Sequence, residues 1–466
     1  MLKNLISIVS ILLFMAGRPV NGQPAIDQTL ISMEEAIARA LLKNNQLKAS
    51  EYALQKAGWD RSHAWTRLFP VISFSTNYTW IDDSTLALRD FTRYLPFPVP
   101  KTVFQNSFYS SIHLTLPIFN ASLLNNISLA GRSEDRAEEL NESTRRTIIF
   151  QVIRSYLNVL KLKEIENLQK DYLTLSQLNY EKAERLYEAG RYSKTDALRW
   201  QVDYQQQLSV VTTSQSDLRG ARIILSRLLN ARLGEFFEVE NKIPQELIKE
   251  SENLLKLEEL ELLNMIQLSE EELLRANAAL SAAKKGEEIS ETLYRNTYNA
   301  YLPVVNLTYI HAWRENATLV LDDYSPKTLV VNLNIPIFTS LQNFTRLKSA
   351  YYEYRQSQEI YYDQLQNIRL ILMETVNKMV NLKTQKSLSA VSVEYNERNY
   401  RIVEQQREKG LVSNIEFVDA KLNLQNAKLA DISNYYDFIS GMVELYYLLG
   451  KLDEIVETHL PVIEQN

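Results

Sequence analysis

The chain of 466 residues contains no cysteine, which excludes disulfide scaffolds, thiolate metal sites, cysteine nucleophiles and lipid anchors attached through cysteine. Histidine is scarce as well. The closest two of the four histidines, His63 and His113, are 113 − 63 = 50 residues apart, so no local pair can bind zinc. The eleven glycines form neither a G-x-G-x-x-G motif nor a phosphate-binding loop. The composition therefore argues against an enzyme, and it predicts neither a metal site nor a cofactor.

The chain also lacks an excess of positive charge. Lys and Arg number 51 and Asp and Glu number 57, which gives a formal charge of −6. A protein that binds duplex nucleic acid needs a basic surface that displaces counterions from the phosphates. We therefore expect no nucleic-acid partner.

Long apolar runs are missing after the first residues. Residues 1–22 have the features of a secretory signal, with Lys3, an apolar run at 5–16 and small residues near Gly22. No later run reaches 18 apolar residues, so we expect no transmembrane helix. If the exported protein enters a membrane, it must do so as strands closed into a barrel.

Proline is absent from two long stretches, residues 118–243 and 337–460. Proline inside a helix costs about 3 kcal/mol, so such stretches can be helical throughout. Apolar residues within them have coiled-coil spacing; Ile149, Ile153 and Tyr156, for example, step by 4 and 3. A second apolar stripe runs beside the first, which indicates helices in the wall of a bundle or cylinder rather than in a two-stranded coil.

The two halves of the chain repeat one pattern. Prolines and glycines recur in the same order with nearly constant offsets, 303 − 70 = 233, 336 − 117 = 219 and 410 − 190 = 220. The matched residues are Pro70, Pro117 and Gly190 in the first half and Pro303, Pro336 and Gly410 in the second. Chance could produce one such match but not an ordered series, so the chain consists of two copies of one unit.

Each copy contains two short segments in which apolar and small polar residues alternate, as in strands with one apolar face. About ten residues per strand, with Trp and Tyr near the ends, is typical of outer-membrane barrels. The small polar residues predicted to face a barrel lumen are Ser73, Ser75, Asn77, Thr79, Asn306, Thr308, Asn332 and Asn334. The alternative, hairpins packed on the helices, is less favoured because the strands have no other core to cover.

Four strands are too few to close a barrel, since about eight are needed. Several copies must therefore pool their strands, which predicts an oligomer that shares one barrel. Pro117 and Pro336 follow the last strand residues of the two hairpins, and we expect both in the first turn of the next helix.

These features resemble the TolC-like outer-membrane efflux proteins over essentially the whole chain after residue 22. The resemblance rests on the duplicated layout, the junctions Phe69-Pro70 and Leu302-Pro303, the L-x-L-x-Pro-Ile-Phe ends of the returning strands and the glycine turns. It implies a homotrimer in which 3 × 4 = 12 strands form one barrel in outer-membrane lipid, continued by a periplasmic α-helical barrel. It also implies two partners, a periplasmic adaptor protein and an inner-membrane transporter of the efflux or ABC type.

The glycine turns resemble the family's inter-helix turns, which form the periplasmic entrance and receive the adaptor. The implied adaptor contacts are Gly190, Arg191, Tyr192, Ser193, Gly410, Leu411, Val412 and Ser413. The resemblance also implies that Glu416 and Asp419, and by position Asp196, line the entrance as acidic rings that favour cations. The alternative is that these are ordinary acidic residues at helix starts, where the helix dipole favours them.

The expected fold class is therefore mainly α with a membrane β-barrel, in which long antiparallel helices accompany four strands per chain. The expected segments are a signal peptide (1–22), an N-terminal periplasmic helix (23–67), a β-hairpin (68–117, loop 81–106), a helical hairpin (118–231), an equatorial linker (232–253), a helix (254–300), a second β-hairpin (301–336, loop 314–327), a second helical hairpin (337–450) and a tail (451–466).

The expected function is a channel without catalytic residues that exports small molecules or proteins from the periplasm and opens when an adaptor docks. The alternative is an exported coiled-coil scaffold or adhesin without a pore. The sequence does not identify the cargo.

Overall fold

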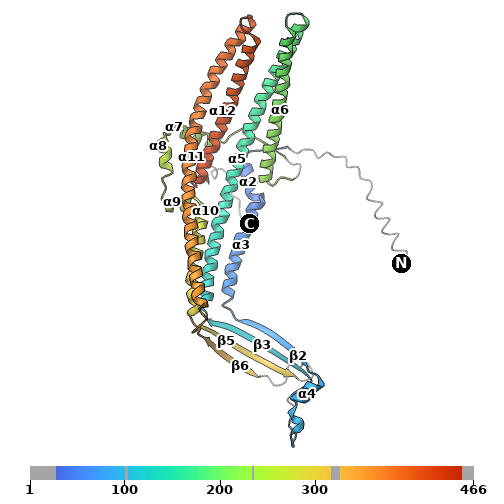
Figure 1. Cartoon of the computed structure of the whole chain (residues 1–466), viewed down its shortest axis with the longest axis vertical. Coiled ribbons are helices and arrows are strands. Elements are labelled where there is room, and N and C mark those ends of the chain that lie inside the picture. The colour runs from blue at the N-terminus through green and yellow to red at the C-terminus, as the bar shows by residue number, and fades with distance from the viewer. Residues whose placement is uncertain (1–27, 100–102, 233–235, 316–325, 454–466) are drawn as a thin grey trace, which may run out of the picture. The chain divides into compact units, whose positions relative to one another are not determined.

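A computed structural model describes residues 28–99, 103–232, 236–315 and 326–453 of the chain (Figure 1). It has two compact units. The first contains residues up to Asn45, Arg145–Ile266 and residues from Met373 onward, and the second contains Gln46–Thr144 and Gln267–Leu372. The expected signal peptide at 1–22, most of the loop at 314–327 and most of the tail at 451–466 lie outside the described residues.

Four long helices dominate both halves of the sequence: α5 (Ala121–Glu188), α6 (Lys194–Leu228), α11 (Gln342–Glu408) and α12 (Asn414–Leu448). At 1.5 Å per residue, the 68 residues of α5 and the 67 of α11 are each about 100 Å long. The structure thus contains a helix–turn–helix in each of the proline-free stretches. Residues of α5 and α11 belong to both units.

The core of the first unit is built on the apolar stripes of α5. Ile149, Ile153 and Tyr156 are fully buried, and so are Ile148 and Val152 of the second stripe. The Tyr156 hydroxyl donates to the carbonyl oxygens of Ile31 and Glu240, each at 3.2 Å. These bonds tie α5 to the ends of β1 (Gln28–Ile31) and β4 (Phe236–Val239), which pair in parallel. The helix therefore has neighbours on two sides, as the double stripe predicted.

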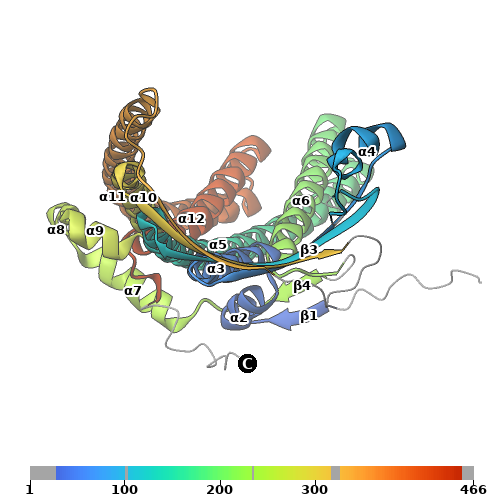
Figure 2. The same cartoon turned by 90° about the horizontal axis from the view of Figure 1, so that it is seen from below.

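The second unit contains an antiparallel sheet in the order β2 (Val71–Trp80), β3 (Asn106–Phe119), β5 (Val304–Glu315) and β6 (Lys327–Asn334). Figure 2 shows β3 and β5 running side by side along the curved sheet. Within the described residues, the outer edges of β2 and β6 pair with no other strand. The sheet thus has two open edges.

The strand register places most of the polar side chains on one face of the sheet and most of the large apolar side chains on the other. Ser75 lies opposite Ser111, and their hydroxyls are 3.0 Å apart; Asn306 lies opposite Asn332. Because side chains alternate between faces, the register places all eight predicted lumen residues on one face of the sheet. The other face presents large apolar side chains, of which Ile72 and Phe74 are examples, and both are exposed.

The prediction that Pro117 and Pro336 lie in the first turn of a helix is wrong. Pro117 lies within β3, where the register shifts between Pro117 and Phe119, and α5 starts only at Ala121. Pro336 follows the end of β6, and α11 starts at Gln342. A proline lacks the N–H that a sheet ladder needs, so it fits a bulge or the residues just beyond a strand as well as it fits a helix start.

The segment 254–300, expected to be one helix, is broken into several. It contains the end of α7 (Gln245–Lys256), then α8 (Glu259–Met265), α9 (Glu270–Ala276), α10 (Ala278–Asn296) and a 3-10 turn, η2 (Thr297–Tyr301). The side chains of Ser269 and Asn277 accept hydrogen bonds from the backbone N–H groups of Glu272 and Leu280. Such caps start a new helix, which explains the breaks.

Two other segments also contain more structure than expected. Residues 23–67 include two helices, α2 (Met33–Lys43) and α3 (Asn45–Thr66), separated at Asn44, where the backbone is extended. The loop at 81–106 contains α4 (Asp83–Arg89) and a 3-10 turn, η1 (Phe91–Tyr94).

Helices α11 and α12 approach closely at Gly441. A Cβ atom on Gly441 would lie 2.8 Å from Sδ of Met379 and 2.9 Å from Cδ1 of Leu382, two buried side chains. We predict that Gly441→Ala destabilises the protein by about 1–3 kcal/mol through overpacking, which would lower Tm in a detergent-solubilised sample followed by circular dichroism.

Gly220, in the middle of α6, is the matched control, because nothing lies within 4 Å of its Cβ position. Gly220→Ala should raise Tm slightly through helix propensity, by about 0.5–1 kcal/mol. An unchanged Tm for Gly441→Ala would contradict the close packing of α11 and α12.

Candidate functional site at the turns of the helical hairpins

The first helix of each hairpin ends at a glycine in the left-handed conformation. Gly190 has φ of 69° and Gly410 has φ of 72°. The N–H of Arg191 donates to the carbonyl of Leu186 at 2.8 Å, and the N–H of Leu411 donates to the carbonyl of Gln406 at 2.9 Å. This is the Schellman arrangement, which uses glycine because a Cβ atom disfavours positive φ. The two glycines therefore set where the chain reverses.

The second helix of each hairpin starts at a serine cap. The hydroxyl oxygens of Ser193 and Ser413 accept from the N–H groups of Asp196 and Glu416 at 3.1 and 3.2 Å. The carboxylate of Glu416 in turn accepts from the N–H of Ser413 at 2.8 Å, which completes a capping box. Glu416 thus has a structural role at the helix start.

Of the eight predicted adaptor contacts, Tyr192 and Val412 are partly buried. The other six are exposed: Gly190, Arg191, Ser193, Gly410, Leu411 and Ser413. Leu411 is the most prominent apolar side chain among them. Each turn therefore presents three exposed residues and one partly buried residue among the predicted contacts.

Asn414 joins the two turns. Its side-chain amide donates to Oδ1 of Asp196 at 3.3 Å, and its amide oxygen accepts from the Tyr192 hydroxyl at 3.5 Å. The first turn of α12 is thereby connected to the turn before α6. Tyr192, one of the predicted adaptor contacts, takes part in this contact.

The three predicted entrance acids occupy different surroundings. Asp196 accepts from the Ser193 hydroxyl at 2.6 Å, and this bond, followed by the bond from Asn414, lowers the pKa of Asp196 below its ordinary value. Because the folded-state pKa of Asp196 is the lower one, these bonds stabilise the folded protein fully at pH values above the unfolded-state pKa of about 4. The stabilisation is lost as the pH falls through the folded-state pKa of Asp196. Asp419 is exposed and lines a cavity of about 510 Å³ between α6 and α12, beside Arg199 and Asp203.

The structure thus brings Asp196 and the capping box of Glu416 together through Asn414, and it places Asp419 one turn further along α12.

A guanidinium that contacts two aromatic rings lies near the turns. The Cζ atom of Arg407 is 4.1 Å from the ring centroid of Phe417 and 4.7 Å from that of Trp200. Its Nη1 donates to Oδ1 of Asn179 at 3.2 Å. Phe417 and Trp200 are fully buried. This cluster takes one residue from each of α5, α6, α11 and α12, so it fastens the two hairpins together.

A buried ion pair forms the next layer. The side chain of Lys421 in α12 is 1% exposed, and its ammonium donates to both carboxylate oxygens of Asp203 at 2.8 and 2.6 Å. It also donates to the Ser176 hydroxyl at 3.1 Å. All three donors of the ammonium therefore have acceptors, on α6 and α5.

Three buried glutamines form a further layer of polar contacts between the helices. The amide nitrogens of Gln207 and Gln425 both donate to Oε1 of Gln169 at 2.7 Å, and Gln425 also donates to Oε1 of Gln207 at 3.2 Å. Hydrogen bonds of this kind fix the register of neighbouring helices, because a shifted helix would leave buried amides without partners.

Sequence reasoning missed these layers, although one signal was available. Phe417, Lys421 and Leu424 have the 4 and 3 spacing of an apolar stripe, and a lysine inside such a stripe is a sign of a buried partner. The sequence contained no indication that the partner would be Asp203, which lies 421 − 203 = 218 residues away.

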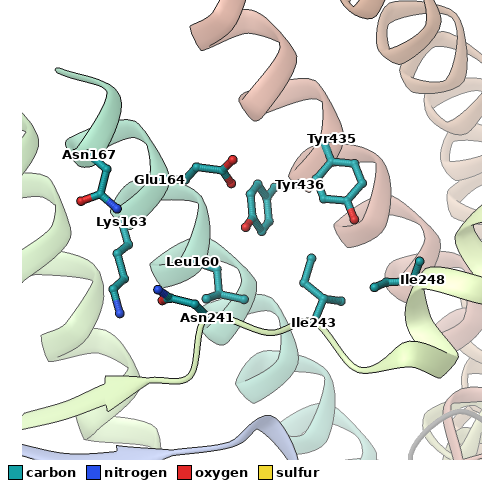
Figure 3. A pocket seen from close by; sticks show the side chains of 9 residues that line it. All are labelled: Leu160, Lys163, Glu164, Asn167, Asn241, Ile243, Ile248, Tyr435 and Tyr436. Carbon is teal, nitrogen blue, oxygen red and sulfur yellow. The ribbon is translucent and has the colours of Figure 1, made fainter. Parts of the chain in front are cut away.

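A separate pocket of about 380 Å³ lies among α5, α12 and the segment between β4 and α7 (Figure 3). Figure 3 shows the tyrosine rings of α12 facing the aliphatic side chains, with charged and amide groups of α5 at one side. Its lining residues are Leu160, Lys163, Glu164, Asn167, Asn241, Ile243, Ile248, Tyr435 and Tyr436. Among the described residues, no group of three or more His, Asp or Glu side chains is arranged to hold a metal ion.

A family model described as "Outer membrane efflux protein" matches residues 36–231 and 270–451. The chain belongs to this family. As a member of the outer membrane efflux proteins, it is located in the outer membrane. No curated protein matches the chain. Among the described residues, no helix is both long enough and apolar enough to span a membrane.

Solved structures of outer-membrane channels have the same fold. The Campylobacter jejuni CmeC channel matches with a TM-score of 0.74 and 15% identity, over 90% of this chain and 86% of that one. Vibrio cholerae VceC matches with a TM-score of 0.72 and 14% identity, over 90% and 96%. The open state of Neisseria gonorrhoeae MtrE matches with 0.67 and 15%, over 90% and 89%. The fold is that of the TolC-like channels.

The buried pair of Lys421 and Asp203 gives a stability prediction. Asp203→Ala should cost about 3–5 kcal/mol, because it leaves a buried ammonium without its counter-charge. The double variant Lys421→Met with Asp203→Leu should recover most of this loss, since apolar residues of similar size can replace a buried pair. Denaturant unfolding of the detergent-solubilised protein measures both. Equal losses in the single and the double variant would show that the pair is not buried as described.

Proposed function

We propose that three copies of this efflux-family protein form a channel through the outer membrane that exports small molecules or proteins from the periplasm. The observation that carries the proposal is the sheet of the second unit. It has one face that carries the eight predicted small polar lumen residues, an opposite face with large exposed apolar side chains, and two open edges. An apolar face suits lipid, and a polar face suits a water-filled lumen.

The open edges support the oligomer. Unpaired backbone N–H and C=O groups cannot remain in the hydrocarbon of a bilayer, so β2 and β6 must find partners. If β6 of one copy pairs with β2 of the next, the sheets close into a ring without edges. Three copies then give 3 × 4 = 12 strands, with Ser73, Asn77 and Asn332 among the residues that face the lumen.

The helical hairpins provide the periplasmic part of the channel in this proposal. Their turns would bind a periplasmic adaptor, which in turn engages an inner-membrane transporter of the efflux or ABC type. In a trimer, Glu416 and Asp419 would each form a ring of three carboxylates, and Asp196 would lie beside these rings. Acidic rings of this kind favour cations at the closed entrance.

Reconstitution tests the proposal. The protein extracted in detergent should have the mass of three chains and should conduct ions in a planar bilayer. Glu416→Gln with Asp419→Asn should reduce its cation selectivity, since glutamine retains an acceptor for the Ser413 N–H while removing the charge. Asp217→Asn, at an exposed position of α6, is the control. A protein that stays soluble in the periplasm would instead be a scaffold without a pore, and unchanged selectivity would remove the acidic entrance.

Adaptor docking has its own test. A photo-crosslinking amino acid at Leu411 or Arg191, both exposed, should capture a periplasmic adaptor in intact cells. The same amino acid at Leu208, an exposed apolar position further along α6, should capture much less. Equal capture at all three positions, or none at the turns of a protein that is in the outer membrane, would contradict docking at the turns.

A further inference from the structure

The connection between β2 and β3 exposes an unusual amount of apolar surface. Leu88 is 77% exposed, Phe91 73% and Tyr94 78%, and Leu95 and Phe97 are exposed as well. We call this segment, residues 83–97, the aromatic loop. Contiguous exposed apolar surface of this kind marks a place where something else packs.

The aromatic loop is held in a defined conformation. Oδ1 of Asp82 accepts from the N–H of Thr85 at 2.7 Å and caps α4. The buried Asp90 accepts from the N–H of Thr92 at 3.1 Å and starts η1. Across the base of the loop, the N–H of Ile81 donates to the carbonyl of Gln105 at 2.9 Å. The apolar side chains are therefore displayed on an ordered support.

A second hydrogen bond holds the base of the aromatic loop together. The side-chain amide of Gln105 donates to Oδ1 of Asp83 at 2.7 Å, so the start of α4 is tied to the residue before β3. Asp83 and Asp90 of the segment, and Asp82 directly before it, are thus used by the loop itself. Apart from Asp83, Ser84 and Arg89, the exposed side chains that the structure describes in the segment are apolar or aromatic.

The place of the aromatic loop suggests what covers it. Helix α3 leads into β2 and β3 leads into α5, so the loop lies at the opposite end of this hairpin (Figure 1). It also follows β2, one of the two edge strands of the sheet. In the proposed trimer, the free edge of β2 pairs with the next copy. The loop would therefore stand at the outer rim of the barrel, next to the seam between two copies.

We propose that the aromatic loops of the three copies pack against one another across the outer mouth of the channel and form an apolar constriction. This inference rests on the proposed trimeric barrel. A ring of 12 strands spaced about 4.8 Å apart and tilted by about 40° has a radius of about 12 Å. The seven residues of α4 and the four of η1 extend to roughly 10 Å and 8 Å, so a loop that starts at the rim can reach the axis.

The constriction gives the channel a second barrier with its own chemistry. A narrow passage lined by Leu88, Phe91 and Tyr94 loses its water readily. Ions cross it only while it is filled with water, so the constriction lowers the conductance of the channel. A cargo molecule with apolar surface would instead replace the contacts among the loops. The outer mouth would therefore resist ions but yield to amphipathic cargo, independently of the acidic turns.

The absence of cysteine from the natural chain allows a direct test. The Leu88→Cys variant of the trimer should form disulfide-linked dimers between copies on mild oxidation. The control is Arg89→Cys, because Arg89 is the next residue, is also exposed and points about 100° away around α4, so this variant should form far fewer dimers.

A fluorophore attached to the single thiol of the Leu88→Cys variant is the test for lipid. Weak quenching by nitroxide-labelled lipids is expected if the loops pack against one another. Strong quenching, without dimers on oxidation, would place the loop on the membrane surface and overturn the proposal.

Conductance tests the constriction itself. Phe91→Ser with Tyr94→Ser should raise the single-channel conductance at least twofold, whereas Leu260→Ser, at an exposed apolar position of α8 outside the loop, should leave it unchanged. A conducting trimer with unchanged conductance overturns the constriction, even if the Leu88→Cys variant forms dimers. A protein that neither assembles into trimers nor conducts would instead contradict the proposed channel, so the two failures can be told apart.

Discussion

The organisation of this efflux-family protein depends on backbone hydrogen bonding at the edges of its sheet. Within the described residues, β2 and β6 leave one side of their backbone without a strand partner. In water such edges would be tolerable, but in an outer membrane every N–H and C=O needs a partner. A single chain of this fold is therefore incomplete in the membrane. In the proposed trimer, the symmetric closure that supplies the missing partners would also create the lumen, so the pore and the oligomer would have one physical cause.

The first unit depends on a different kind of constraint. Long helices with apolar stripes can slide past one another by a turn with little loss of apolar contact. The stacked Arg407, the buried Lys421 and the three glutamines remove this freedom, because a shift would leave buried charges and amides without partners. Near the turns, the hairpins are therefore aligned by polar groups rather than by the stripes. In the proposed trimer, such alignment would position the turns against the other copies and the adaptor.

Sequence periodicity was sufficient to predict the long helices, the strands and the shared face of Ser75, Asn306 and Asn332, because these follow from spacings of 3.5 and 2 residues. It was insufficient where two local rules compete. A proline fits a β-bulge as well as a helix start, and Pro117 lies at a bulge. Ser269 and Asn277 cap new helices within a segment whose pattern predicts one continuous helix. The contacts of Lys421 depend on which helices meet, and no local pattern contains that information.

The two ends of the proposed channel have opposite chemistry for a physical reason. The turns carry acidic side chains at helix starts, where caps and the helix dipole stabilise negative charge. The aromatic loop uses its aspartates internally as caps and as a tether, and so presents apolar side chains outward. A barrier made of charge selects by sign, and a barrier made of apolar side chains selects by the ability to displace water. Together they would hold back ions of both signs while they admit cargo that a transporter has already selected.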